Sequence, residues 1–158
     1  MDAPISASYL PSFSMGNDLE GIGGWLILVA IGLALAPLSC LHGMIVDLRV
    51  LYGRSYQTHL GARPGLAALV LYEAATNTIF LFAILALNLL FYLKKKAFPF
   101  WMITYLVCHL ALIFIDHIAA LRFYPHSSPA SLLQSLVGTV IWIPYYLRSE
   151  RVTATFVR

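Results

Sequence analysis

The sequence predicts an all-α, polytopic membrane protein folded as a bundle of four transmembrane helices. Of its 158 residues, 60% are hydrophobic and only 11% are charged, and the mean hydropathy is +0.80. In an average soluble domain, about a quarter of the residues are charged. The apolar residues also gather into four runs near the ~20-residue length that crosses a hydrocarbon core of about 30 Å. Both observations predict helices that span a bilayer.

The four runs define one membrane domain over residues 21–147. We expect its spans at about residues 21–46, 65–93, 98–121 and 131–147. Pro37 is expected to bend the first span and Pro144 to kink or end the fourth, because proline lacks the N–H that a helix needs.

Two tails flank this domain, over residues 1–20 and 148–158. The first contains no Lys or Arg and no long apolar run, so we expect a disordered tail rather than a cleaved signal peptide. Residues 94–96 are three lysines between the second and third spans, and further arginines follow the fourth span. Because positive charge favours the cytoplasmic side, both tails are predicted to be cytoplasmic. Six basic residues support this orientation, and four oppose it: Arg49, Arg54, Arg63 and Arg122.

The charge and cysteine content exclude several classes of protein. The formal net charge is +3, but the Lys and Arg residues flank the apolar runs and form no basic face, so we expect no nucleic-acid partner. Cys40 and Cys108 both lie within apolar segments, which predicts buried free thiols rather than a disulfide framework or a zinc motif. The lipid bilayer is the partner that the composition implies.

The first span opens with three glycines, in the sequence GIGGW at residues 21–25. This pattern lacks the G-x-G-x-x-G spacing of a phosphate-binding loop, and no strand precedes it. Glycines instead allow another segment to approach the backbone closely, as small residues do between helices in lipid. With both termini on one side, we expect residues 141–158 to dock there, and Trp25 to anchor the helix at headgroup level.

These two ends of the chain resemble a known family. G-I-G-G-W-L-I-L at the start of the first span, with W-I-P-Y-Y-L-x-S-E-R-V-x-x-T-F-V at the end of the chain, is similar to the bacterial inner-membrane family catalogued as domain of unknown function 2569. The resemblance implies a four-span protein of the bacterial inner membrane and supplies no reaction. The matching positions are Gly21, Gly23, Gly24, Trp25, Trp142, Pro144, Tyr145, Ser149, Arg151, Val152, Thr155 and Phe156.

Polar residues inside the spans predict a pocket in the leaflet opposite the termini. An ionisable group in hydrocarbon costs about 2.5–3.5 kcal/mol on insertion scales, so such groups usually face the bundle interior. At 3.6 residues per turn, Glu73, Asn77 and Asn88 share one stripe of the second span. His109 and Asp116 share a face of the third span, and the depth of Asp116 in the membrane overlaps that of Glu73. The pocket candidates are Glu73, Asn77, His109, Asp116, His117 and His42, with Gln134 and Ser135 at a similar level.

Several functions remain open for these residues. We expect a non-enzymatic accessory, scaffold or assembly subunit that docks a larger membrane protein complex. The alternatives are binding or transport of a small molecule, proton or metal ion through the pocket, and an intramembrane enzyme with an acid/base pair. The structural interpretation is that Glu73 is protonated or paired with Arg122 or a histidine, while Asn77, Asn88 and the histidines join helices by hydrogen bonds. No ligand spacing assigns a metal, and no motif assigns a cofactor.

Overall fold

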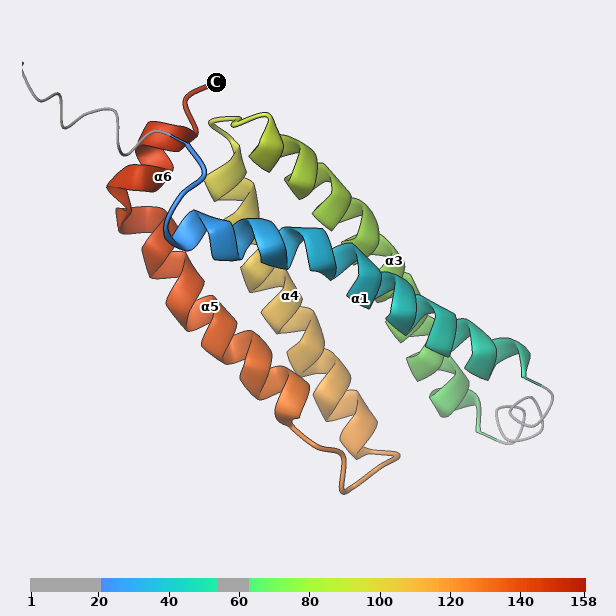
Figure 1. The fold of residues 1–158 in the computed structure, drawn as a ribbon. Coiled ribbons are helices and arrows are strands. Elements are labelled where there is room, and N and C mark those ends of the chain that lie inside the picture. The colour runs from blue at the N-terminus through green and yellow to red at the C-terminus, as the bar shows by residue number, and fades with distance from the viewer. Residues whose placement is uncertain (1–20, 54–62) are drawn as a thin grey trace, which may run out of the picture.

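The computed structural model describes residues 21–53 and 63–158, and this part of the chain contains helices and no strand. The prediction of a disordered N-terminal tail falls on residues outside this part, as does Arg54. The described helices are α1 (Trp25–Tyr52), α3 (Pro64–Tyr92), α4 (Phe98–Leu121), α5 (Ala130–Arg148) and the short α6 (Glu150–Thr155) (Figure 1).

The four long helices confirm the predicted four-helix membrane bundle. Each is long and apolar enough to cross a membrane. Many of their large apolar side chains point outwards, as Phe82 does with 67% of its surface exposed. Such a surface suits contact with lipid chains rather than with water.

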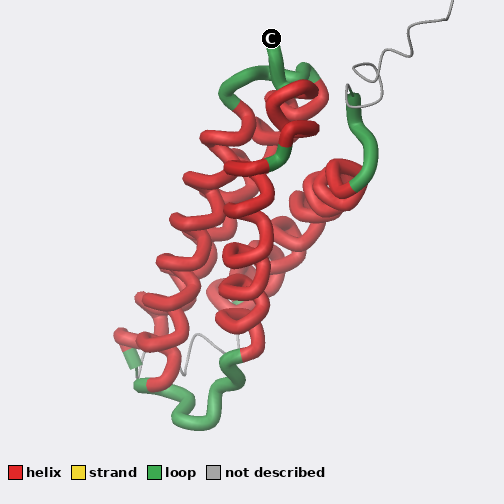
Figure 2. Tube along the Cα trace, turned by 90° about the vertical axis from the view of Figure 1, so that its left-hand side faces the viewer, coloured by secondary structure: helices red, strands yellow, loops and turns green. Residues whose placement is uncertain are grey.

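Helix α1 crosses the bundle obliquely. It begins beside α5, where the ring centroids of Trp25 and Trp142 lie 6.5 Å apart, and it ends alongside α3 (Figure 1). Helices α4 and α5 pack against each other as an antiparallel pair, and α3 contacts α4. Figure 2 shows the short α6 and the C-terminus over one end of the bundle, and the long loops at the other end.

The most deeply buried side chains lie at the end of the bundle that carries α6. Phe98 is fully buried, and its ring stacks on that of Phe156 with centroids 4.6 Å apart. The chain also closes here through its backbone, because Lys96 N donates to Arg158 O at 2.6 Å and Arg158 N donates to Lys94 O at 3.2 Å. The C-terminal segment is therefore part of the folded domain rather than a free tail.

The first helix differs from the predicted span at both ends. It begins at Trp25, after the glycines, because Gly24 has φ of 55°, in the left-handed region that a right-handed helix excludes. It continues past Val46 to Tyr52, so Asp47 lies on a helix and not in a loop.

The prolines end neither of the helices that contain them. Helix α1 continues through Pro37, and α5 continues through Pro144 to Arg148. Of the two outcomes expected for Pro144, a kink or the end of the fourth span, the helix does not end there.

Candidate functional site

Three carboxylates on three helices approach the same end of the bundle. At ~1.5 Å per residue, Asp47 and Asp116 lie about 8 Å before the ends of α1 and α4, and Glu73 lies about 14 Å beyond the start of α3. All three belong to the half of the bundle opposite α6. The connections between these helices therefore bring together acids that are far apart in the sequence.

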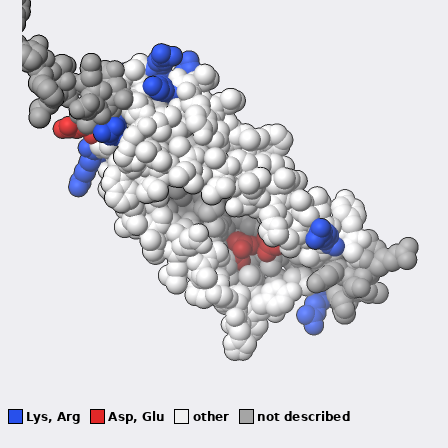
Figure 3. All heavy atoms as spheres, viewed as in Figure 1, with Lys and Arg blue, Asp and Glu red and all other residues white. Residues whose placement is uncertain are grey.

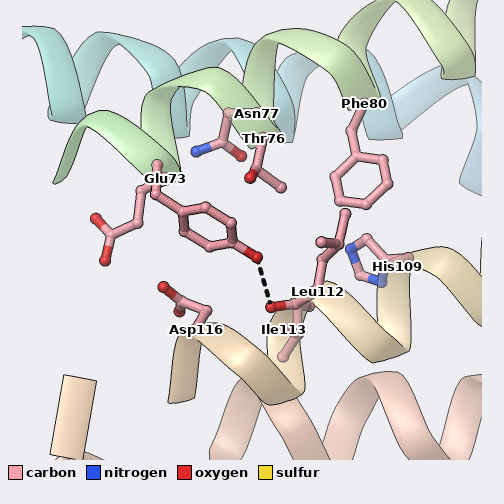
Figure 4. Close-up of a pocket in the computed structure, with 9 residues that line it drawn as sticks. Glu73, Thr76, Asn77, Phe80, His109, Leu112, Ile113 and Asp116 are labelled. Atoms are coloured by element: carbon pink, nitrogen blue, oxygen red, sulfur yellow. Dashed lines mark hydrogen bonds between the residues drawn. The ribbon is translucent and has the colours of Figure 1, made fainter. Parts of the chain in front are cut away.

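Glu73 and Asp116 line a cavity of about 120 Å³ between α3 and α4. Their carboxyl groups point toward each other across it (Figure 4). The Tyr72 hydroxyl bridges the same two helices by donating to Leu112 O at 3.1 Å. The cavity is lined by Tyr72, Glu73, Thr76, Asn77, Phe80, His109, Leu112, Ile113 and Asp116.

One oxygen of the carboxylate pair lacks a partner. Asp116 Oδ1 is buried and has no hydrogen bond in the described part of the chain. An unsatisfied polar atom inside a protein is costly, and more so in a membrane, where no water compensates it. Two facing carboxylates also repel each other when both are ionised. This arrangement favours a proton or another positive group between them.

Asp47 adds a third carboxylate, and a side chain of α3 donates a hydrogen bond to it. Only 7% of its surface is exposed, and Asn77 Nδ2 donates to its Oδ2 at 2.9 Å. Gly43, one turn earlier on α1, makes room for this contact, because a Cβ there would lie 2.9 Å from Asn77 Nδ2. Asp47 was not among the predicted pocket residues because the first span was expected to end at about residue 46, although the apolar pattern continues through Leu48, Val50 and Leu51.

His109 forms the inner wall of the cavity. Its Nδ1 lies 3.1 Å from Ser135 Oγ of α5, and its ring stacks on Tyr105 with centroids 5.7 Å apart. Phe80 approaches the same ring at 4.9 Å. Neighbours from three helices thus fix the histidine ring in the wall of the acidic cavity.

Not every predicted pocket residue reaches this cavity. His42 is exposed on α1, His117 is half-buried, and neither lines the cavity. Asn88, predicted on the stripe of Glu73 and Asn77, instead donates through Nδ2 to Leu33 O of α1 at 2.9 Å. The four candidates that the structure brings together are Glu73, Asn77, His109 and Asp116.

The face that carries the cavity is hollowed, and acidic side chains lie at the bottom of the hollow (Figure 3). Residues other than Lys, Arg, Asp and Glu surround them, and the basic residues visible on this face lie toward the two ends of the molecule. Among the described residues, no group of three or more His, Cys, Asp or Glu side chains could hold a metal ion.

The predicted contact region at the other end contains several close approaches. A Cβ on Gly23 would lie 2.8 Å from an Nη atom of Arg151, so the guanidinium rests on the glycine backbone. The Thr155 hydroxyl donates to Gly21 O at 3.0 Å. Three aromatic rings lie around this contact. The ring of Trp142 makes edge contacts with those of Trp25 and Tyr145. Pro144, another predicted residue of this region, is exposed.

The fold and the hollow together define a multi-pass membrane protein with acidic groups between its helices. The chain matches the family described as protein of unknown function (DUF2569) over residues 19–157, and it belongs to that family. This membership confirms the resemblance seen in the glycine motif and the C-terminal segment. Neither a curated protein nor a solved structure matches the chain.

Proposed function

We propose that this protein binds a positively charged group in its acidic hollow, as a ligand-binding or carrier protein of a bacterial inner membrane. In this proposal the hollow lies in the leaflet opposite the C-terminus. If the C-terminus is cytoplasmic, the hollow is in the outer leaflet and binds its ligand there. Glu73 and Asp116 contact the charge, and Asp47 strengthens the negative potential from behind Asn77.

The observation that carries this proposal is the facing pair Glu73 and Asp116, from α3 and α4, at a cavity of about 120 Å³. Ionisable groups in a membrane interior are expensive and mark functional sites by default. A pair of acids is a poor structural bridge, since it joins two helices only while a proton or cation lies between them. The cost of holding both acids in this position is offset when a cation binds.

The amides of this protein show what structural bridging looks like here. Asn88 and Asn77 each donate to an acceptor on α1 at 2.9 Å. Amide side chains thus supply the bridging role that the structural interpretation assigned to them and to the histidines. Glu73 and Asp116 differ from them because each presents acceptors to the other.

The role of an accessory or assembly subunit remains a prediction, and co-purification in mild detergent tests it directly. A stoichiometric protein partner identified by mass spectrometry would support it. The binding proposal expects a response to cations from the protein isolated alone, so the two functions are separable by experiment.

A thermal-stability assay in lipid nanodiscs tests cation binding. Titration with butylammonium should raise the Tm of the wild type in a saturable way, because a ligand that binds only the folded state stabilises it. Butyrate at equal ionic strength should have no such effect. Glu73→Gln and Asp116→Asn keep the side-chain shape and should abolish the response.

The matched control is Glu150→Gln, since Glu150 is an exposed carboxylate on α6, far from the hollow in the fold. This variant should respond to butylammonium like the wild type. An equal response of all four proteins, or no response in the wild type, would show that this acid pair binds no cation.

A further inference from the structure

We infer that the ligand is an amphiphile with a cationic head and a single long apolar chain, which lies in the groove between α1 and α5. This inference rests on the proposed function, and it adds the chemical class of the ligand and its route of entry. The head occupies the acidic hollow, and the chain extends toward the α6 end of the bundle.

A second cavity, of about 180 Å³, lies on the α1 and α5 side of the bundle. Its wall contains apolar side chains from all four long helices, with two tyrosines and a tryptophan. The lining residues are Leu28, Val29, Gly32, Leu33, Ala36, Ile84, Met102, Tyr105, Trp142 and Tyr146.

The acidic and apolar cavities are neighbours along α4. Tyr105 lines the apolar cavity and His109 lines the acidic one, and their rings stack one helical turn apart with centroids at 5.7 Å. Figure 3 shows one continuous hollow on this face, with the acidic side chains toward one end of it. The two cavities are thus the polar and apolar ends of one groove.

The length of this groove suits a lipid-like chain. Between Asp116 at the acidic end and Met102 at the apolar end, α4 extends about 21 Å at ~1.5 Å per residue. That distance exceeds half of a hydrocarbon core of about 30 Å. A small hydrophilic cation would leave most of the groove unused, whereas an amphiphile matches both ends.

The apolar end is open to the bilayer from the side. Leu28 and Gly32 are exposed on α1, and a Cβ on Gly32 would have no atom within 4 Å apart from its own helix. Tyr146, with only 5% of its surface exposed, lines the same cavity, and its hydroxyl has no hydrogen-bond partner in the described part of the chain. A chain can therefore enter laterally from lipid, while the head is selected by charge at the other end.

A larger apolar groove on the protein provides an internal comparison. Its volume is about 580 Å³, it lies between α3 and α4, and Trp101 and Cys108 are among its lining residues. Among the described residues, no acidic side chain lines it, but Phe80 and Leu112 line both this groove and the acidic cavity. It is therefore the alternative path for the chain of the same ligand, and the experiment has to distinguish it from the groove between α1 and α5.

Photo-cross-linking distinguishes these positions. The probe is hexadecylammonium with a diazirine near the chain end, added to the full-length protein in nanodiscs and mapped by peptide mass spectrometry. Cross-links are expected on the lining residues of α1 and α5, such as Leu33 and Trp142. Glu73→Gln should reduce them at least tenfold, and unlabelled hexadecylammonium should compete while hexadecanoate should not.

A matched pair of glycine variants tests the path of the chain. Gly32→Leu places a side chain in the apolar cavity and should remove the cross-links at Leu33 and Trp142. Gly138→Leu, on α5, introduces the same side chain at another position with no atom within 4 Å of a Cβ, and it should leave the cross-links unchanged.

Cross-links confined to Trp101 and Cys108, or unaffected by Gly32→Leu, would overturn the inference. If butylammonium still stabilises the wild type in that case, the proposed function stands and only the amphiphile is wrong. If neither probe binds, the proposed function itself fails.

Discussion

Asn88 of α3 donates a hydrogen bond to the backbone oxygen of Leu33 in α1, with Nδ2 and O 2.9 Å apart. Leu33 lies four residues before Pro37, the position whose N–H would normally donate to that oxygen. Proline has no N–H, so the Leu33 carbonyl loses its partner within the helix. In a membrane no water replaces it, and a polar side chain from a neighbouring helix satisfies the freed oxygen instead.

Replacing Asn88 by leucine should therefore destabilise the protein. We expect Asn88→Leu to lower the free energy of unfolding by about 1–2 kcal/mol, the range found for hydrogen bonds between membrane helices in model peptides. Unfolding of the protein in mixed micelles, followed by circular dichroism, measures the change.

Pro37→Ala provides the test of the mechanism, because it restores an N–H to α1. In the Pro37→Ala background, Asn88→Leu should cost clearly less than it does in the wild type, since Leu33 O regains an intrahelical donor. An equal cost in both backgrounds would mean that Asn88 stabilises the protein by some other contact.

Residue spacing was enough to predict which polar side chains of α3 and α4 share a face, but not which partner each one meets. Glu73, Asn77, His109 and Asp116 come together as the helical period predicts. Asn88 lies on the predicted stripe, yet it contacts α1 because α1 crosses the bundle obliquely. That crossing angle depends on packing between helices, which the period of one helix does not determine.

The backbone angles of the glycines before α1 predict how much a substitution there destabilises the protein. Gly24 has φ of 55°, and a Cβ there would meet only Arg151 Nε at 3.7 Å. The ψ of Gly24 is −131°, a combination that residues with a side chain rarely adopt. We therefore expect Gly24→Ala to cost about 1–3 kcal/mol. The measurement is the free energy of unfolding in mixed micelles.

Gly32→Ala is the control for this effect. Gly32 lies inside α1 with open space around it, and alanine is the better helix former by roughly 0.5–1 kcal/mol. This variant should be neutral or stabilising, and a loss of stability equal to that of Gly24→Ala would refute the backbone explanation.

The orientation of the protein is testable with reporter fusions. The backbones of Lys94 and Lys96 pair with that of Arg158, so the α3–α4 turn and the C-terminus must lie on one side. We expect fusions after Leu93 and after Arg158 to report the cytoplasm, because the three lysines favour that side. A fusion at Pro125, in the loop between α4 and α5, should report the periplasm, and the reverse pattern would invert the topology.

The contact between Gly43 and Asn77 predicts how the protein responds when a single methyl group is added at Gly43. A Cβ on Gly43 would lie 2.9 Å from Nδ2 and 3.1 Å from Cγ of Asn77. The amide has to move, and its hydrogen bond to the buried Asp47 carboxylate is then lost. Because a buried acceptor without a partner costs about 1–3 kcal/mol, Gly43→Ala should destabilise the protein by that amount in mixed micelles.

A double-mutant cycle separates this mechanism from a general packing defect. Asn77→Ala removes the same hydrogen bond and should cost about as much as Gly43→Ala. The double variant should cost no more than Asn77→Ala alone, since the added methyl group no longer meets an amide. Additive costs would show that Gly43 and Asn77 act independently, and that Gly43 is needed for the approach of the α1 and α3 backbones rather than for the hydrogen bond between Asn77 and Asp47.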